Sequence, residues 1–152
     1  MRLVCAHTKR MRTLASVTRE SSASPSAFYA RWVDHDSWRE WSPDTDWARV
    51  EGEVRRGARG ILKPVGGPRT AFEISELEPD RVYTDVSRMP GARLTFRHEV
   101  EPTPGGSRLT VLVTLEGPLS WLWARTAFAG FERSVPADLD RLVALVEAVH
   151  AR

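Results

Sequence analysis

The chain has 152 residues, a net charge of +2 and 28% charged residues, an ordinary globular composition that excludes disordered and fibrous proteins. This length suits one domain with one hydrophobic core. We assign residues 1–11 to a loose tail and residues 12–150 to the domain. The basic residues, nearly all arginines, are scattered among acidic ones, so no nucleic-acid surface is indicated.

Nothing in the sequence indicates export or membrane insertion. The only cysteine is Cys5, so no intrachain disulfide can form, which fits a reducing compartment. The apolar run at residues 3–6 is too short for a signal peptide, and no run of roughly eighteen apolar residues follows. We expect a cytoplasmic protein without integral membrane association. Translation can start at Met1 or at Met11.

The first predicted elements are a strand at residues 13–20, a helix at 25–33 and a short helix at 37–41. Ser24 can cap the first helix, and Pro25 suits its first position. Six predicted strands follow, at residues 45–51, 58–63, 69–77, 81–87, 92–101 and 107–116. The turns between them are short, which indicates an antiparallel meander.

The last predicted element is a long helix at about residues 118–150, because apolar residues recur there at helical spacing. Gly117-Pro118 opens it, and Pro136 should kink it or divide it near residues 133–135. The strands at 92–101 and 107–116 each have one apolar face, which the helix would cover. The predicted fold class is α+β.

Four tryptophans, Trp32, Trp38, Trp41 and Trp47, lie close together in the sequence. Three indoles left in water would expose about 500 Å² of mostly apolar surface, so they must line something. We expect Trp32 to anchor the first helix and Trp47 to begin the next strand. Trp38 and Trp41 would form a lid over a ligand cavity or part of the core.

Four segments of the sequence give information beyond the order of the predicted elements. Trp32-x5-Trp38-x2-Trp41, Lys63-Pro-x-Gly-Gly-Pro68, the segment from Asp85 to His98 and Gly117-Pro-Leu-Ser-Trp121 resemble the polyketide cyclase/dehydrase branch of the START-like and birch-allergen-like (SRPBCC) superfamily. The resemblance implies a helix-grip fold, in which a mostly seven-stranded antiparallel sheet wraps a long C-terminal helix. It also implies a cavity between sheet and helix, near the two short helices.

His98 is the best acid/base candidate, because it shares an apolar strand face with Leu94 and Phe96. A histidine with a pKa near 6.5 exchanges protons at neutral pH. The alternative is a buried, neutral histidine bonded to a backbone or hydroxyl group. His35, between Asp34 and Asp36, is expected to be a solvated cap.

Tyr83 and Asp85 share one face of their strand, opposite the β-branched residues Val82, Thr84 and Val86. We prefer the β-branched set as the inward one. If the other set faces the cavity, Tyr83 and Asp85 become a hydrogen-bond donor and a carboxylate that can polarise an enol.

The sequence contains no phosphate-binding glycine loop, no metal-ligand spacing and no nucleophile elbow, so we expect neither metal nor cofactor. We expect a monomer or homodimer that binds a small hydrophobic, aromatic or polyketide-like molecule. The activity would be cyclisation or dehydration by acid/base chemistry; the alternative is a non-catalytic carrier or sensor. The expected ligand wall is Trp38, Trp41, Phe72, Leu94, Phe96, Trp121, Phe128 and Phe131.

Overall fold

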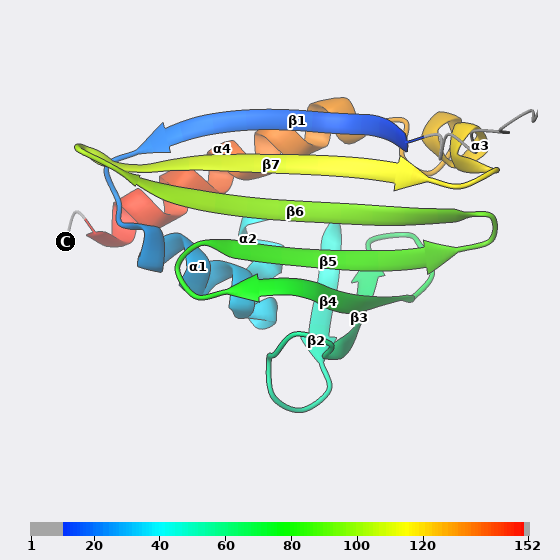
Figure 1. Cartoon of the computed structure of the whole chain (residues 1–152), viewed down its shortest axis with the longest axis horizontal. Helices are drawn as coiled ribbons and strands as arrows, with labels where there is room; N and C mark the ends of the chain where they lie inside the picture. Colours follow the sequence, from blue (N-terminus) through cyan, green and yellow to red (C-terminus); the bar gives the residue numbers. More distant parts are fainter. Residues whose placement is uncertain (1–10, 151–152) are drawn as a thin grey trace, which may run out of the picture.

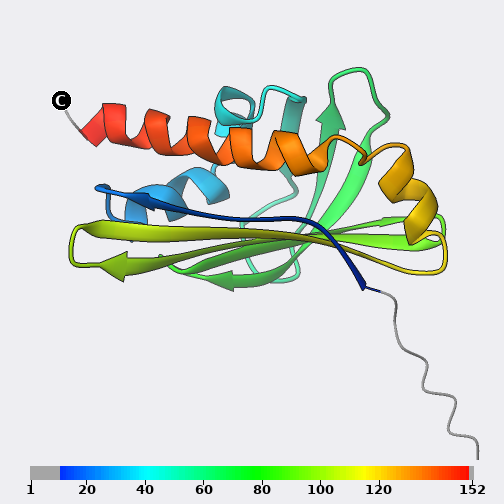
Figure 2. The same cartoon turned by 90° about the horizontal axis from the view of Figure 1, so that it is seen from above.

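A computed structural model describes residues 11–150. Seven strands form one antiparallel sheet in the order β1-β7-β6-β5-β4-β3-β2, and the helices lie on one side of it (Figures 1 and 2). The strands are β1 (Met11–Ser21), β2 (Thr45–Val50), β3 (Arg59–Pro64), β4 (Thr70–Glu78), β5 (Val82–Met89), β6 (Ala92–Thr103) and β7 (Gly106–Glu116). The helices are α1 (Pro25–Val33), the short 3₁₀ helix η1 (His35–Ser37), α2 (Trp38–Trp41), α3 (Ser120–Arg125) and α4 (Phe131–His150). This architecture is the predicted helix-grip α+β fold.

Each strand from β2 to β6 is paired with the next strand along the chain, as the short turns predicted. β1 pairs with β7 at the far edge, so the first and last strands of the chain are neighbours. This pairing brings the segment after β1, which contains α1, η1 and α2, to the same side of the sheet as α4 (Figure 2).

The predicted helix at residues 25–33 is confirmed as α1, with Pro25 in its first turn. Ser24 occupies the position before it but does not cap it, because its hydroxyl lies 3.1 Å from the hydroxyl of Ser26 instead of bonding a backbone N–H. Buried Phe28 and Trp32 hold α1 on the sheet. The predicted short helix appears as η1 and α2 in succession.

The C-terminal helix is divided, but not where Pro136 predicted. The break falls at residues 126–130, between α3 and α4, and Pro136 lies inside α4. Because Pro136 is in the second turn of α4, its missing N–H removes only one backbone hydrogen bond, which a helix packed through Val135 and Leu139 tolerates. Thr126, by contrast, has a non-helical backbone and ends α3.

α3 is attached to the turn between β5 and β6. The backbone N–H of Leu119 donates to the carbonyl of Gly91 at 2.9 Å. Gly117 has φ 121°, and a side chain there would collide with the backbone of Gly91 and Ala92. Glycine is therefore required at this close approach, which places α3 at the end of the sheet (Figure 1).

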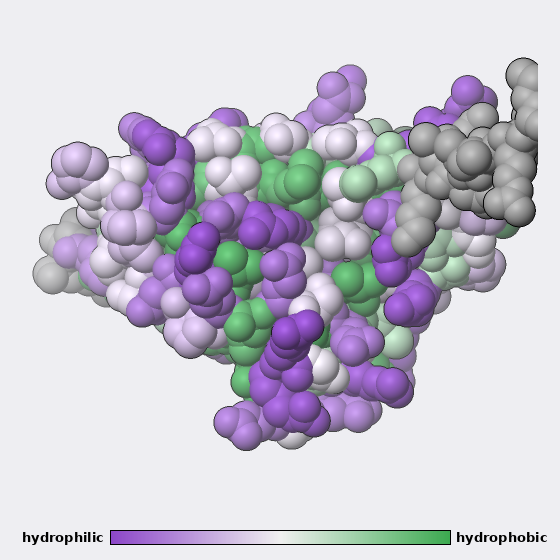
Figure 3. All heavy atoms as spheres, viewed as in Figure 1, coloured by the Kyte–Doolittle hydropathy of each residue, from purple (hydrophilic) through white to green (hydrophobic). Residues whose placement is uncertain are grey.

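The outer face of the sheet carries ion pairs, among them Arg97 with Glu76 and Glu99, and Arg108 with Glu20 and Glu101. Hydrophilic side chains accordingly cover much of this face in Figure 3. The inner face, toward the helices, holds most of the hydrophobic core. A binding site for a small molecule is therefore expected on the inner face or at its edges.

The lengths of the helices and the range of the described residues concern two of the expectations from the sequence. Among the described residues, no helix is both long and apolar enough to cross a membrane. The predicted tail, with Cys5 and His7, lies outside the described residues apart from Met11.

Candidate functional site

Tyr83 and Asp85 lie on the inner face of β5. Tyr83 pairs with His98 of β6 and Asp85 pairs with Phe96, and directly opposed residues of antiparallel strands share a face. The hydroxyl of Tyr83 also contacts His35 in η1, on the helix side. The preference for the β-branched set as the inward one is therefore wrong.

The β-branched residues gave the wrong prediction of the inward face because both faces of β5 are covered. Thr84, on the outer face, is only 1% exposed. Its hydroxyl donates to Glu76 at 3.1 Å, and Glu76 also pairs with Arg97, so long charged side chains shield this part of the strand. A strand covered on both sides has no clear polar and apolar face in its sequence.

A hydrogen-bonded chain connects η1 to the middle of the sheet. His35 Nε2 and Tyr83 Oη share a hydrogen bond at 2.8 Å, and Asp85 lies two residues along the same face of β5. His98 Nδ1 donates to the carbonyl of Tyr83 at 3.3 Å. Because that carbonyl can only accept, a neutral His98 carries its proton on Nδ1 and leaves Nε2 as an acceptor.

Burial shifts the pKa values of this cluster in opposite directions for acids and bases. Desolvation raises the pKa of Asp85 to about 7, with the Tyr83 hydrogen bond partly opposing it. Desolvation lowers the pKa of His35 to about 4 and that of His98 to about 4, and it raises the pKa of Tyr83. Asp85 is therefore the member of the cluster whose charge changes near neutral pH.

His98 lies where the sequence placed it, on the inner face, 6% exposed. It has the environment of the alternative interpretation: buried, neutral and bonded to a backbone carbonyl. Its ring also packs against Trp32 and Trp41, with centroid distances of 5.4 and 6.5 Å. A role for His98 in catalysis stays a prediction.

His35 is the member of the site that the sequence analysis missed. The expectation of a solvated cap is wrong, since His35 is 6% exposed and its ring lies 4.6 Å from that of Trp38 and 5.7 Å from that of Phe72. Its two aspartate neighbours, both exposed, suggested a polar loop. The available signal was its spacing of three residues from both Trp32 and Trp38, one turn of helix in each direction.

The inner face divides into two regions that differ in how completely helices cover it. In the packed region, under α1 and the C-terminal part of α4, side chains are at most 2% exposed; we define it as Phe28, Trp32, Tyr83, Val100, Leu109, Leu142 and Val146. In the open region, toward α3 and the start of α4, inward side chains are only partly buried; we define it as Leu62, Ser87, Met89, Ala92, Phe96, Trp123, Phe128 and Phe131. Asp85 is paired with Phe96 and so borders the open region.

Most of the expected ligand wall lies in or beside these two regions. Phe96, Phe128 and Phe131 form a row in the open region, with centroid distances of 5.6 Å between Phe96 and Phe131 and 4.9 Å between Phe131 and Phe128. Trp38, Trp41, Phe72 and Leu94 are buried in the core. Trp121 is 46% exposed and is not part of this arrangement.

Two buried polar groups have no partner among the described residues: the indole N–H groups of Trp32 and Trp41. Trp38 differs, because its indole N–H donates to the carbonyl of Trp32 at 3.0 Å. Buried donors usually have an acceptor or an ordered water. The two unpaired donors both belong to rings that pack on His98.

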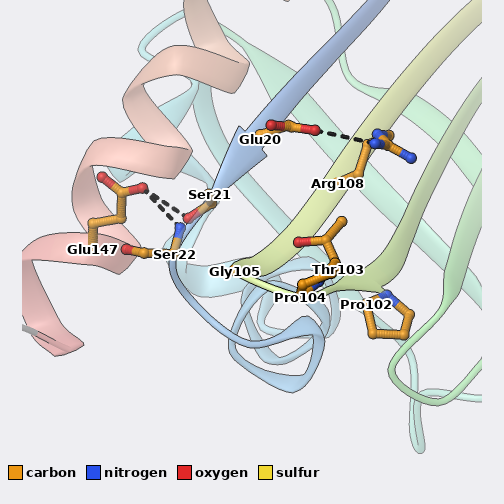
Figure 4. Close-up of a pocket in the computed structure, with 9 residues that line it drawn as sticks. All are labelled: Glu20, Ser21, Ser22, Pro102, Thr103, Pro104, Gly105, Arg108 and Glu147. Atoms are coloured by element: carbon orange, nitrogen blue, oxygen red, sulfur yellow. Dashed lines mark hydrogen bonds and ion pairs between the residues drawn. The ribbon is translucent and has the colours of Figure 1, made fainter.

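A surface depression at the other end of the sheet does not have the same character. It is lined by Glu20, Ser21, Ser22, Pro102, Thr103, Pro104, Gly105, Arg108 and Glu147 (Figure 4). Its polar groups already bond one another, as in the contact of 2.8 Å from the Ser21 hydroxyl to Glu147. It is shallow and has no aromatic lining, so we do not assign it a ligand.

Within residues 11–150, no three His, Cys, Asp or Glu side chains are grouped so that they can hold a metal ion. The polar cluster of His35, Tyr83, Asp85 and His98 contains a single carboxylate, that of Asp85.

Solved structures of the same fold include proteins from several sources. The protein MLL2253 from Mesorhizobium loti is 20% identical, with a TM-score of 0.69 and coverage of 90% of this chain and 98% of that chain. The di-domain ARO/CYC protein StfQ of the steffimycin biosynthetic pathway is 16% identical, with a TM-score of 0.71, and the match covers 90% of this chain and 51% of StfQ. Ara h 8.0201 is 16% identical, with a TM-score of 0.65 and coverage of 91% and 99%.

At these identities the structures establish the fold alone. No curated protein matches the sequence. Residues 12–147, however, match the family described as polyketide cyclase / dehydrase and lipid transport. Since the match spans almost the whole chain, the protein belongs to this polyketide cyclase/dehydrase and lipid transport family, within the superfamily that its sequence motifs indicated.

Proposed function

We propose that the protein binds a small aromatic or polyketide-like molecule in the open region and uses Asp85 to transfer a proton on it. The observation that carries this proposal is the position of Asp85, a buried carboxyl that borders an apolar, aromatic and partly uncovered region. Apolar sites with a few placed polar groups are the usual form of small-molecule sites.

Asp85 has the pKa that such chemistry needs. With a pKa of about 7, both its carboxylate and its carboxylic acid are present at neutral pH. The carboxylate would take a proton from a carbon next to a ligand carbonyl, giving an enolate. The enolate carbon would attack a second carbonyl carbon of the same molecule, and the carboxylic acid would return its proton to the new alkoxide.

Tyr83, His35 and His98 are positioning residues in this proposal. Tyr83 lowers the pKa of Asp85 from the same face of β5, and His35 holds the hydroxyl of Tyr83 at 2.8 Å. His98 fixes the backbone of β5 through the carbonyl of Tyr83. A positioned base gains rate because its geometry is set before the reaction begins.

Proton exchange on an enolisable aromatic ketone tests the proposal directly. Anthrone in D₂O, without oxygen, is followed by NMR for loss of its methylene protons, with wild-type protein, Asp85→Asn and the exposed control Asp46→Asn. We expect wild type and Asp46→Asn to accelerate exchange, and Asp85→Asn to lose the acceleration about a hundredfold.

Binding is measured in parallel by quenching of tryptophan fluorescence. Anthrone should bind wild type and Asp85→Asn with similar affinity, and the quenching should shrink in Trp41→Phe if Trp41 covers the ligand. Exchange that is equally fast with Asp85→Asn would disprove the role of Asp85. Absence of binding would disprove the site itself.

The second candidate is a non-catalytic carrier of hydrophobic molecules. One observation favours it: both inward histidines are neutral and hydrogen-bonded, so Asp85 acts without a second acid or base beside it. Anthrone binding without any acceleration of exchange would favour the carrier.

A further inference from the structure

We propose that the end of the molecule that carries α3 docks on the surface of an anionic lipid bilayer. Its outward side chains are unusually apolar for a surface: Trp121 is 46% exposed, Leu122 41%, Leu119 38% and Val65 64%. Most of the other large apolar side chains of the described chain are buried or partly buried. A gathering of exposed large apolar residues marks an interaction surface.

Three segments form this end, which we call the docking end: residues 61–72, 86–98 and 117–131. They hold the β3–β4 turn, the β5–β6 turn and α3 with the linker to α4. Figure 1 places α3 and the β5–β6 turn at one end of the sheet, and Figure 2 shows the β3–β4 turn rising on the helix side, near the start of α4.

The charge of the docking end differs from that of the whole chain. The three segments contain no Asp or Glu, although acidic residues flank them. Of these, Glu116 pairs with Arg93 and Glu99 pairs with Arg97, so these two arginines add no free charge. Arg69, Arg88 and Arg125 are exposed there, and none of them makes an ion pair with another of residues 11–150. The docking end is therefore basic and apolar at once.

An anionic bilayer fits this combination better than a free acidic ligand. Basic side chains near an anionic bilayer each contribute about 1 kcal/mol, and tryptophan and leucine side chains insert at the boundary between headgroups and acyl chains. A free acidic ligand would be met by the arginines but would leave Trp121 and Leu122 pointing to water.

The three segments of the docking end also contain all the residues of the open region. Trp123 of α3 and Phe128 of the linker belong to the open region, while Trp121 and Leu122 of the same segment point outward. A bilayer at this surface would be the source from which an apolar ligand reaches the interior. Docking does not depend on proton transfer by Asp85, so the two proposals fail separately.

Vesicle binding by the full chain tests the proposal. Binding to vesicles of phosphatidylcholine alone and of phosphatidylcholine with phosphatidylglycerol is measured by sedimentation at low and high salt. We expect binding to the anionic vesicles only, weakened by salt. Arg125→Gln should lower the affinity about fivefold and Trp121→Ala about tenfold.

Two exposed residues far from the docking end provide matched controls. Val149→Ala, at the C-terminal end of α4, and Arg56→Gln, between β2 and β3, should change vesicle affinity less than about twofold. Absence of vesicle binding, or binding that Trp121→Ala and Arg125→Gln leave unchanged, would disprove the proposal.

Two further outcomes would replace the bilayer by another occupant. If a short-chain anionic amphiphile binds but vesicles do not, the arginines serve a free ligand. If Trp121→Ala converts a dimer to a monomer in analytical ultracentrifugation without affecting vesicle binding, the surface joins two copies of the chain. Either result would overturn docking on a bilayer.

Discussion

The packed and open regions are built on the same sheet, yet only the packed region is completely buried. In β6, Val100 lies in the packed region with 0% exposure, whereas Phe96, on the same inner face, is partly exposed. Their strand pattern is the same, an inward apolar residue at every second position. What differs is the cover, since α1 and the C-terminal part of α4 close the packed region, and the divided helix leaves the open region partly uncovered.

The largest expected effect is a difference in stability between the two regions. Phe28→Ala in the packed region should lower the free energy of unfolding by about 3–5 kcal/mol, because it leaves a cavity among fully buried side chains. Phe131→Ala in the open region should lower it by about 1 kcal/mol, since Phe131 already contacts solvent. Urea unfolding of both variants measures the difference, and equal losses would mean that the open region is as tightly packed as the other.

The next effect concerns Asp85, at the border between the regions. Its folded pKa of about 7 is above its unfolded value of 3.8, so the native state binds more protons between these values. The free energy of unfolding therefore loses a contribution as pH rises from about 4 to 7, on the order of 4 kcal/mol in total.

Asp85→Asn removes that loss. The free energy of unfolding of the variant should equal that of wild type below about pH 4 and exceed it above about pH 7. His35 and His98 have lowered pKa values and act in the opposite direction, but both proteins keep them, so the difference isolates Asp85. Urea unfolding across this pH range measures it. Parallel pH profiles for the two proteins would show that Asp85 is ionised with its ordinary pKa.

A smaller effect is expected for Tyr83→Phe. The change removes one hydroxyl and leaves the buried His35 without its partner, which should cost about 1–3 kcal/mol of stability. Since the Tyr83 hydrogen bond lowers the pKa of Asp85, its loss should move the midpoint of the pH–rate profile for anthrone exchange upward. Tyr29→Phe, on a partly exposed residue of α1, is the control; an unchanged midpoint in Tyr83→Phe would mean that Tyr83 does not control Asp85.

The smallest effect is expected at Trp121, outside both regions. Because this side chain is 46% exposed, Trp121→Ala should change the free energy of unfolding by less than about 0.5 kcal/mol. The same variant should weaken vesicle binding, which separates surface function from stability. A large loss of stability would instead place Trp121 in the core.

The element order was predictable from the sequence because each signal was local. The α1 range, the six strands of the meander and the short helix at 37–41 follow from periodicity and turn residues, and the observed bounds differ from the predicted ones by two residues or fewer. The division of that short helix into η1 and α2 was not predicted. The helix division was misplaced for the opposite reason. Pro136 is a strong local signal, but packing of α4 through Val135 and Leu139 overrode it.

The sequence by itself therefore determined the fold, the family and the inward position of His98. Only the tertiary structure decided that Tyr83 and Asp85 face inward, that His35 joins them from η1, and that Trp121 faces outward. These facts depend on contacts between segments far apart in the chain, such as the 48 residues that separate His35 from Tyr83. Periodicity shows whether a strand has an apolar face. When ion pairs cover the other face as well, only the neighbouring elements show which side of the strand is the interior.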